Sequence, residues 1–157
     1  MTSPHAAAPP SALKMATRRA SLRPAGLAAL IMLVVQFALG MGVNLYVTLP
    51  PAGTPGRSHD QAFSNGPLLA AHAVVGLLLV ITALYLLVRA IIARHVTVIV
   101  TSVIGLAAII TAAVYGASFA SKVTDADSLG MALATAVALA CYAVGLFAAP
   151  ARRAGAP

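Results

Sequence analysis

The sequence VTVIVTSVIGLAAIITAAVYGASFAS occupies residues 96–121 and contains no charged residue. About 20 apolar residues in a helix cross the ~30 Å hydrocarbon core of a bilayer. Such a segment must be helical there, because no water satisfies its backbone groups. Comparable stretches occupy residues 25–49, 67–89 and 129–149. With short connections between them, the sequence predicts an all-α polytopic membrane protein whose four transmembrane helices form an antiparallel bundle.

The composition agrees with this class of protein. Hydrophobic residues make up 61% of the chain and charged residues 8%, whereas a soluble domain contains about 25% charged residues. We expect three parts: a disordered basic segment over residues 1–24, the bundle over residues 25–149 and a short tail over residues 150–157. Four spans in a chain of 157 residues leave no room for a separate soluble domain.

Basic residues flank the predicted spans asymmetrically. They precede the first span, separate the second from the third and follow the fourth, at Lys14, Arg18, Arg19, Arg23, Arg89, Arg94, Arg152 and Arg153. The other side holds only Arg57, Lys122 and the three acidic residues. The positive-inside rule then places both termini of a multi-pass plasma-membrane protein in the cytoplasm. The basic side faces anionic headgroups, so we expect the lipid bilayer as partner and no nucleic acid.

The N-terminal segment bears on whether the chain carries a cleaved export signal, and the single cysteine bears on whether it exchanges disulfides. Arg18 and Arg19 resemble a twin-arginine export signal, which leaves a cleaved signal as an alternative. The apolar residues continue to Leu49, beyond the short core of a cleavable signal, so we expect an uncleaved anchor. Cys141 is the only cysteine, which excludes a membrane disulfide exchanger because that activity needs paired thiols.

Each predicted span carries small or polar residues at helical spacing, which indicates the face that packs against other helices. In a bilayer, helices associate through close backbone approach and hydrogen bonds, since lipid is as apolar as leucine. Gln36, Gly40 and Asn44 follow one another four residues apart and share one helix face. We expect four glycines to lie at helix contacts, namely Gly40, Gly76, Gly105 and Gly145.

Polar side chains inside the spans form a candidate intramembrane site. Four of them lie in the half of the bundle opposite the basic side, namely Asn44, His72, Tyr115 and Ser118, and Gln36 lies near the middle. An ionisable residue inside a span is a functional hypothesis by default. His72 has three interpretations: a neutral imidazole bonded to Asn44, Tyr115 or a carbonyl, a contact to a ligand or cofactor, or a proton relay.

Haem is the sharpest form of the cofactor hypothesis. Four-helix membrane bundles usually hold haem b with two histidines, and imidazole is an ordinary axial ligand. His72 is the only histidine inside a span, so the second ligand would be Met41 or Met131. The sequence shows no catalytic triad, metal cluster or nucleotide-binding loop. We therefore expect no catalytic residue, no metal and no cofactor, with haem b bound by His72 as the alternative.

The chain also resembles known membrane proteins. Gln36, the Gly40-x-Gly42-x-Asn44 segment, the Pro- and Gly-rich connection after it and His72-x-x-x-Gly76 are similar to a group of uncharacterised four-helix integral membrane proteins from high-GC bacteria. That group implies the four-helix fold and carries no established activity. A fainter likeness is to cytochrome b561-type four-helix membrane proteins, which carry paired haem-binding histidines that this chain lacks.

These observations predict a non-enzymatic function. We expect a small bundle that binds or supports another membrane component, with a membrane-protein partner or a second copy of the chain as candidate partners. The alternative is a redox protein that binds haem b or a quinone near His72.

Overall fold

The computed structural model describes residues 22–47, 66–122 and 124–149. This part of the chain contains four helices and no strand: α2 (Leu22–Tyr46), α4 (Pro67–Ala93), α5 (Val96–Lys122) and α6 (Asp125–Ala148). Each helix is long and apolar enough to cross a membrane. The predicted all-α fold of a multi-pass membrane protein is confirmed. Most of the expected N-terminal segment and the expected tail over 150–157 lie outside the described residues.

The first two helices differ in their bounds from the predicted spans. Helix α2 begins three residues before the predicted start, and Pro24 lies in its first turn, where a helix needs no N–H from proline. Helix α4 continues four residues past Arg89 and ends at Ala93. The next residue, Arg94, caps the helix with a left-handed backbone conformation (φ 51°). Arg89 is accommodated inside the helix because its guanidinium donates to the Tyr85 hydroxyl at 3.2 Å.

Helix α6 also begins earlier than predicted, at Asp125 instead of Leu129. Thr124 caps the helix, since its hydroxyl accepts a hydrogen bond from the Asp127 backbone N–H at 3.3 Å and donates one to the Asp127 carboxylate at 2.5 Å. Carboxylates in a first turn are favoured by the helix dipole. The polar segment that the hydropathy pattern assigns to a loop is therefore the capped first turn of the helix.

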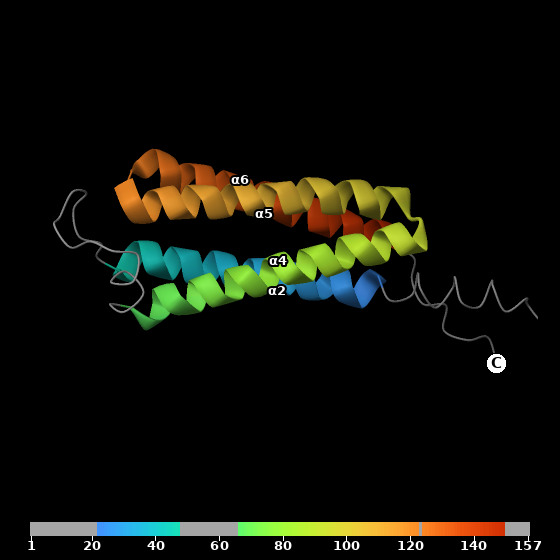
Figure 1. The fold of residues 1–157 in the computed structure, drawn as a ribbon, viewed down its shortest axis with the longest axis horizontal. Coiled ribbons are helices and arrows are strands. Elements are labelled where there is room, and N and C mark those ends of the chain that lie inside the picture. Colours follow the sequence, from blue (N-terminus) through green and yellow to red (C-terminus); the bar gives the residue numbers. More distant parts are fainter. Residues whose placement is uncertain (1–21, 48–65, 123, 150–157) are drawn as a thin grey trace, which may run out of the picture.

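The helices form an antiparallel bundle of two hairpins, α2–α4 and α5–α6 (Figure 1). Helix α4 also contacts α5, and α2 also contacts α6, so each helix packs against two neighbours. We name the ends by residues: the Arg94 end, where α4 passes into α5, and the Asp125 end, where α6 begins. In Figure 1 the two hairpins converge toward the Arg94 end and lie further apart toward the Asp125 end.

Within the α5–α6 hairpin, a glycine of each helix contacts a side chain of the other helix. A Cβ atom at Gly105 would lie 2.6 Å from Cε2 of Tyr142, and one at Gly145 would lie 2.7 Å from Oγ1 of Thr101. Real Cβ atoms essentially never approach other atoms so closely. The ring of Tyr142 and the hydroxyl of Thr101 therefore pack directly on the opposing backbone, which is how small residues hold helices together in a membrane.

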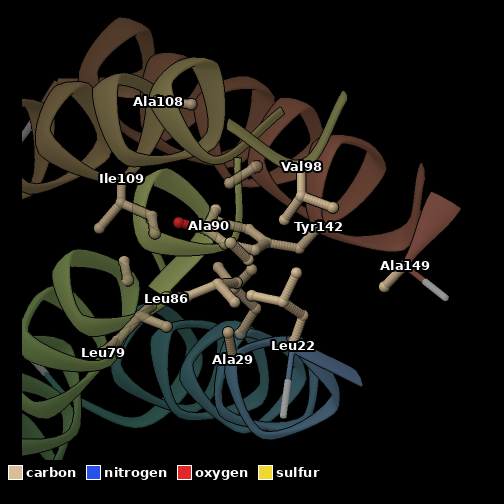
Figure 2. Packing of buried hydrophobic residues seen from close by; sticks show 14 residues of the cluster. Leu22, Ala29, Leu79, Leu86, Ala90, Val98, Ala108, Ile109, Tyr142 and Ala149 are labelled. Carbon is tan, nitrogen blue, oxygen red and sulfur yellow. The ribbon is translucent and has the colours of Figure 1, made fainter. Parts of the chain in front are cut away.

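The buried core is concentrated in the half of the bundle toward the Arg94 end. Tyr142 is 2% exposed and is the largest fully buried side chain of the described residues. Figure 2 shows its ring among residues of the other helices, including Leu86, Val98 and Leu22. This aromatic ring fills the space between the two hairpins, so the bundle is closed at this level.

We predict that Gly105→Leu lowers the thermal unfolding temperature of the detergent-purified protein much more than Val103→Leu. Gly105 faces the Tyr142 ring, whereas Val103 is 49% exposed on the outside of the same helix. Overpacking of this kind costs about 1–3 kcal/mol, and a larger residue on the lipid face costs little. Equal losses for the two variants would show that the contact face of α5 is assigned wrongly.

Candidate functional site

A cavity of about 470 Å³ separates the two hairpins in the half of the bundle toward the Asp125 end. All four helices line it, and most of the lining side chains are apolar. Helix α5 contributes small residues along most of its length here: Ala112, Ala113, Gly116, Ala117 and Ala120. The cavity lies inside the bundle, because all of its lining residues belong to the four helices that are long and apolar enough to cross a membrane.

The cavity results from a change in side-chain size along α5. Up to Ile110 the helix carries valine, isoleucine and leucine at most positions, and from Thr111 onward it carries mainly alanine, glycine and serine. Tyr142, which fills the space between the hairpins toward the Arg94 end, does not line the cavity. Helix α5 continues through this half of the bundle with smaller side chains. The two hairpins therefore enclose space that the described side chains do not fill.

The two ends of the cavity differ in chemistry. Its floor consists of Leu33, Leu79 and Ile109, which are 1%, 2% and 5% exposed and belong to the buried core. Its rim, near the Asp125 end, includes the amide of Asn44 and the hydroxyl of Ser128. The cavity is therefore closed and apolar at the middle of the bundle and polar at the end of the helices.

A hydrogen-bonded pair, Gln36 and His72, lies in the cavity wall between α2 and α4. Nε2 of Gln36 is 3.2 Å from Nε2 of His72. With the amide in this orientation, its N–H donates to the imidazole, which places the ring proton of a neutral histidine on Nδ1. Gln36 Oε1 and His72 Nδ1 are buried and have no further hydrogen-bond partner in the structure.

Two glycines make room for this pair. A Cβ atom at Gly40 would lie 3.1 Å from Cε1 of His72, and one at Gly76 would lie 3.0 Å from Nε2 of Gln36. On α2, Gly40 lies four residues after Gln36 and faces His72 of α4. On α4, Gly76 lies four residues after His72 and faces Gln36 of α2. The α2–α4 hairpin repeats the reciprocal contact that Thr101 and Tyr142 make in the α5–α6 hairpin.

The structure brings together part of the predicted site. Gln36, Asn44 and His72 line the cavity, whereas Tyr115 and Ser118 are not among its lining residues. The ring of Tyr115 packs on α6, where a Cβ atom at Gly130 would lie 2.8 Å from it. His72 is hydrogen-bonded to Gln36 and not to Asn44 or Tyr115, the side chains expected as its partners.

The described residues do not fit a haem with two histidine ligands. His72 is the only histidine in the cavity wall, and its Nε2 is engaged by Gln36. Met41 and Met131 line the same cavity, but the Met131 sulfur packs on α5, where a Cβ atom at Gly116 would lie 3.4 Å from it. Among the described residues, no group of three or more His, Cys, Asp or Glu side chains could hold a metal ion.

Sequence reasoning missed the residues that shape the cavity. The small residues of α5 and the floor residues carry no polar group, so a search for chemistry-bearing side chains passes over them. One signal was present in the sequence, the change from large to small residues near Thr111. A decrease in volume on one helix indicates a cavity only if the facing helices do not compensate with larger residues, and the sequence alone does not show which residues face one another.

The comparisons with known proteins found no family model, no curated protein and no solved structure that matches this chain.

We predict that His72→Gln is mild and that His72→Leu is not. Glutamine keeps a donor and an acceptor, whereas leucine leaves the Gln36 amide without its partner in a buried position. Hydrogen bonds between membrane helices average about 0.6 kcal/mol and reach about 1.7, and the loss for His72→Leu should fall in that range. Unfolding of the purified protein, measured for both variants, checks this.

A double-mutant cycle isolates the pair. Gln36→Leu combined with His72→Leu should cost less than the sum of the single substitutions, because the double variant leaves no unpaired amide. Additive losses, or a loss for His72→Gln as large as that for His72→Leu, would show that the hydrogen bond between these residues contributes nothing.

Proposed function

We propose that this protein is a non-enzymatic membrane protein that binds an apolar membrane molecule in the cavity between its two hairpins. The observation that carries the proposal is the cavity itself, about 470 Å³ in volume and lined from all four helices. Ligand pockets in proteins measure about 300–1,000 Å³ and combine apolar walls with a few polar groups. Here Gln36, His72 and Asn44 supply the polar groups.

The position of the cavity supports a ligand that comes from the bilayer. Phe37 and Met41 of α2 and Leu77 of α4 both line the cavity and are exposed on the bundle surface. The cavity therefore reaches the lipid-facing surface along α2 and along α4, where the hairpins separate. A molecule dissolved in the membrane can enter between the hairpins without crossing water.

The orientation is part of the proposal. Of the four described Lys and Arg residues, Arg23, Arg89 and Arg94 lie toward the Arg94 end. Lys122 lies at the other end, together with Asp125 and Asp127. We propose a bacterial plasma membrane with both termini in the cytoplasm, following the positive-inside rule. The cavity then lies in the outer leaflet.

A topology reporter tests this orientation. A reporter enzyme that is active only outside the cytoplasm should be active when inserted in residues 52–64 or at Thr124, and silent when fused after Arg153. The expectation follows from the side that carries most of the basic residues. Activity of the fusion after Arg153 would reverse the orientation and place the cavity in the inner leaflet.

Filling the cavity tests the binding function. We predict that wild-type protein purified from native membranes carries a small apolar molecule or lipid that mass spectrometry detects, and that Ala112→Phe reduces its amount at least tenfold. Ala112 lines the cavity, and a phenyl ring there takes the ligand's space.

Ala107→Phe is the matched control, because Ala107 is exposed on the same helix and does not line the cavity. It should leave the bound amount unchanged, and thermal unfolding of both variants shows whether they fold. Equal occupancy in wild type and Ala112→Phe would mean that the bound molecule lies elsewhere and would overturn the proposal.

The alternative function is redox chemistry with haem b or a quinone at the cavity. His72, Met41 and Met131 line one cavity, and histidine with methionine is one of the axial ligand pairs that hold haem iron. Protein from haem-supplied cells would then show a Soret band that both His72→Gln and His72→Leu abolish. A colourless protein with a lipid in the cavity supports the main proposal.

In a further alternative, a second copy of the chain or another membrane protein covers the surface where the two hairpins separate. The size of the purified complex distinguishes this alternative.

A further inference from the structure

The cavity has the depth of one leaflet of the bilayer. Leu33, Leu79 and Ile109 lie near the middle of α2, α4 and α5, so the floor is close to the mid-plane of the bundle. On α2 the lining runs from Leu33 to Asn44, which at 1.5 Å per residue is about 16 Å. Half of the ~30 Å hydrocarbon core is about 15 Å. The cavity thus extends along the bundle axis from the mid-plane to the level of the headgroups.

The cavity is also narrow. Its volume of about 470 Å³ divided by a depth of about 16 Å gives a mean cross-section of about 30 Å². Carbon atoms in contact lie about 4 Å apart, so one extended hydrocarbon chain needs about 16 Å² and two chains side by side need about 32 Å², slightly more than the mean cross-section. An α-helix with side chains is about 10 Å across and does not fit. The dimensions select a single chain over a two-chain lipid or a helical segment of a protein.

The chemistry of the walls sets the direction of such a chain. The floor is made of three buried aliphatic side chains and offers no polar group. Asn44 and Ser128 at the rim each offer a donor and an acceptor. A hydroxyl or carboxyl head group finds hydrogen-bond partners at the rim, next to the polar end of the helices, and a hydrocarbon tail is matched by the apolar floor.

From these observations we infer that the ligand is a single-chain lipid with a hydroxyl or carboxyl head group, and that the floor of Leu33, Leu79 and Ile109 fixes the longest chain the cavity accepts. The inference rests on the proposed function and names its ligand class. An extended chain advances about 1.2 Å per bond, so a depth of about 16 Å corresponds to about 13 carbon atoms. The surrounding lipid is as apolar as the cavity, so selection is by fit and not by hydrophobicity.

A chain-length series tests the inference. Fatty acids and primary alcohols of 8 to 20 carbons are offered to delipidated protein at a fixed lipid-to-detergent ratio, and native mass spectrometry measures the bound fraction. Binding should be strongest near 13 carbons and should fall at least fivefold by 18 carbons, because a longer chain meets the floor. Both head groups should give the same optimum.

Substitutions of the floor residues should change the longest chain that the cavity accepts. Leu79→Ala removes three carbon atoms from the floor and should shift the optimum upward by about two carbons, and Ile109→Ala should do the same if Leu79→Ala does not fold. Leu84→Ala is the control, since Leu84 lies on the same helix, is 46% exposed and does not line the cavity. It should leave the optimum unchanged.

The outcomes separate the two proposals. Binding without dependence on chain length, an optimum that Leu79→Ala and Ile109→Ala leave in place, or equal binding of a two-chain phospholipid would overturn the single-chain inference and leave the proposed function standing. Failure of every lipid to bind, with no apolar molecule found in protein from native membranes, would overturn both.

Discussion

The structure depends on one constraint: inside a bilayer, helices are held by close backbone approach and not by the hydrophobic effect. Each hairpin meets this constraint with reciprocal contacts in which a glycine of one helix receives a side chain of the other. In α5–α6 these contacts pair Gly105 with Tyr142 and Gly145 with Thr101; in α2–α4 they pair Gly40 with His72 and Gly76 with Gln36. Between the hairpins, the glycine contact is the looser one of Gly26 with Leu146, at 3.7 Å.

Two tight hairpins joined at one end leave space at the other. Tyr142 and the aliphatic residues around it fill the junction toward the Arg94 end, whereas the alanines and Gly116 of α5 leave the opposite half open. The hydrogen bond between Gln36 and His72 therefore joins α2 to α4, and the same two side chains form part of the cavity wall. The proposed binding function follows from this asymmetry between the two halves and requires no catalytic group.

The sequence predicted what depends on local composition. Four spans and their order follow from hydropathy, and the glycine positions follow from helical spacing, because both are properties of a single helix. The helix ends differed by up to four residues, since Thr124 caps α6 and Tyr85 accommodates Arg89 inside α4. The pairing of His72 with Gln36 was not predicted, because it depends on the register between two helices. The cavity was not predicted either, since it is space that four helices leave between them.

The most direct test of this account is a cryo-electron microscopy map of the protein purified from native membranes into nanodiscs, with a rigid antibody fragment bound to add mass. The account predicts rod-shaped density that no protein atom explains, running along the bundle axis from the level of Asn44 to Leu33, with the hairpins in contact only in the half toward the Arg94 end. A map in which the small residues of α5 pack directly on α2 and α4, with no space between the hairpins, would contradict it.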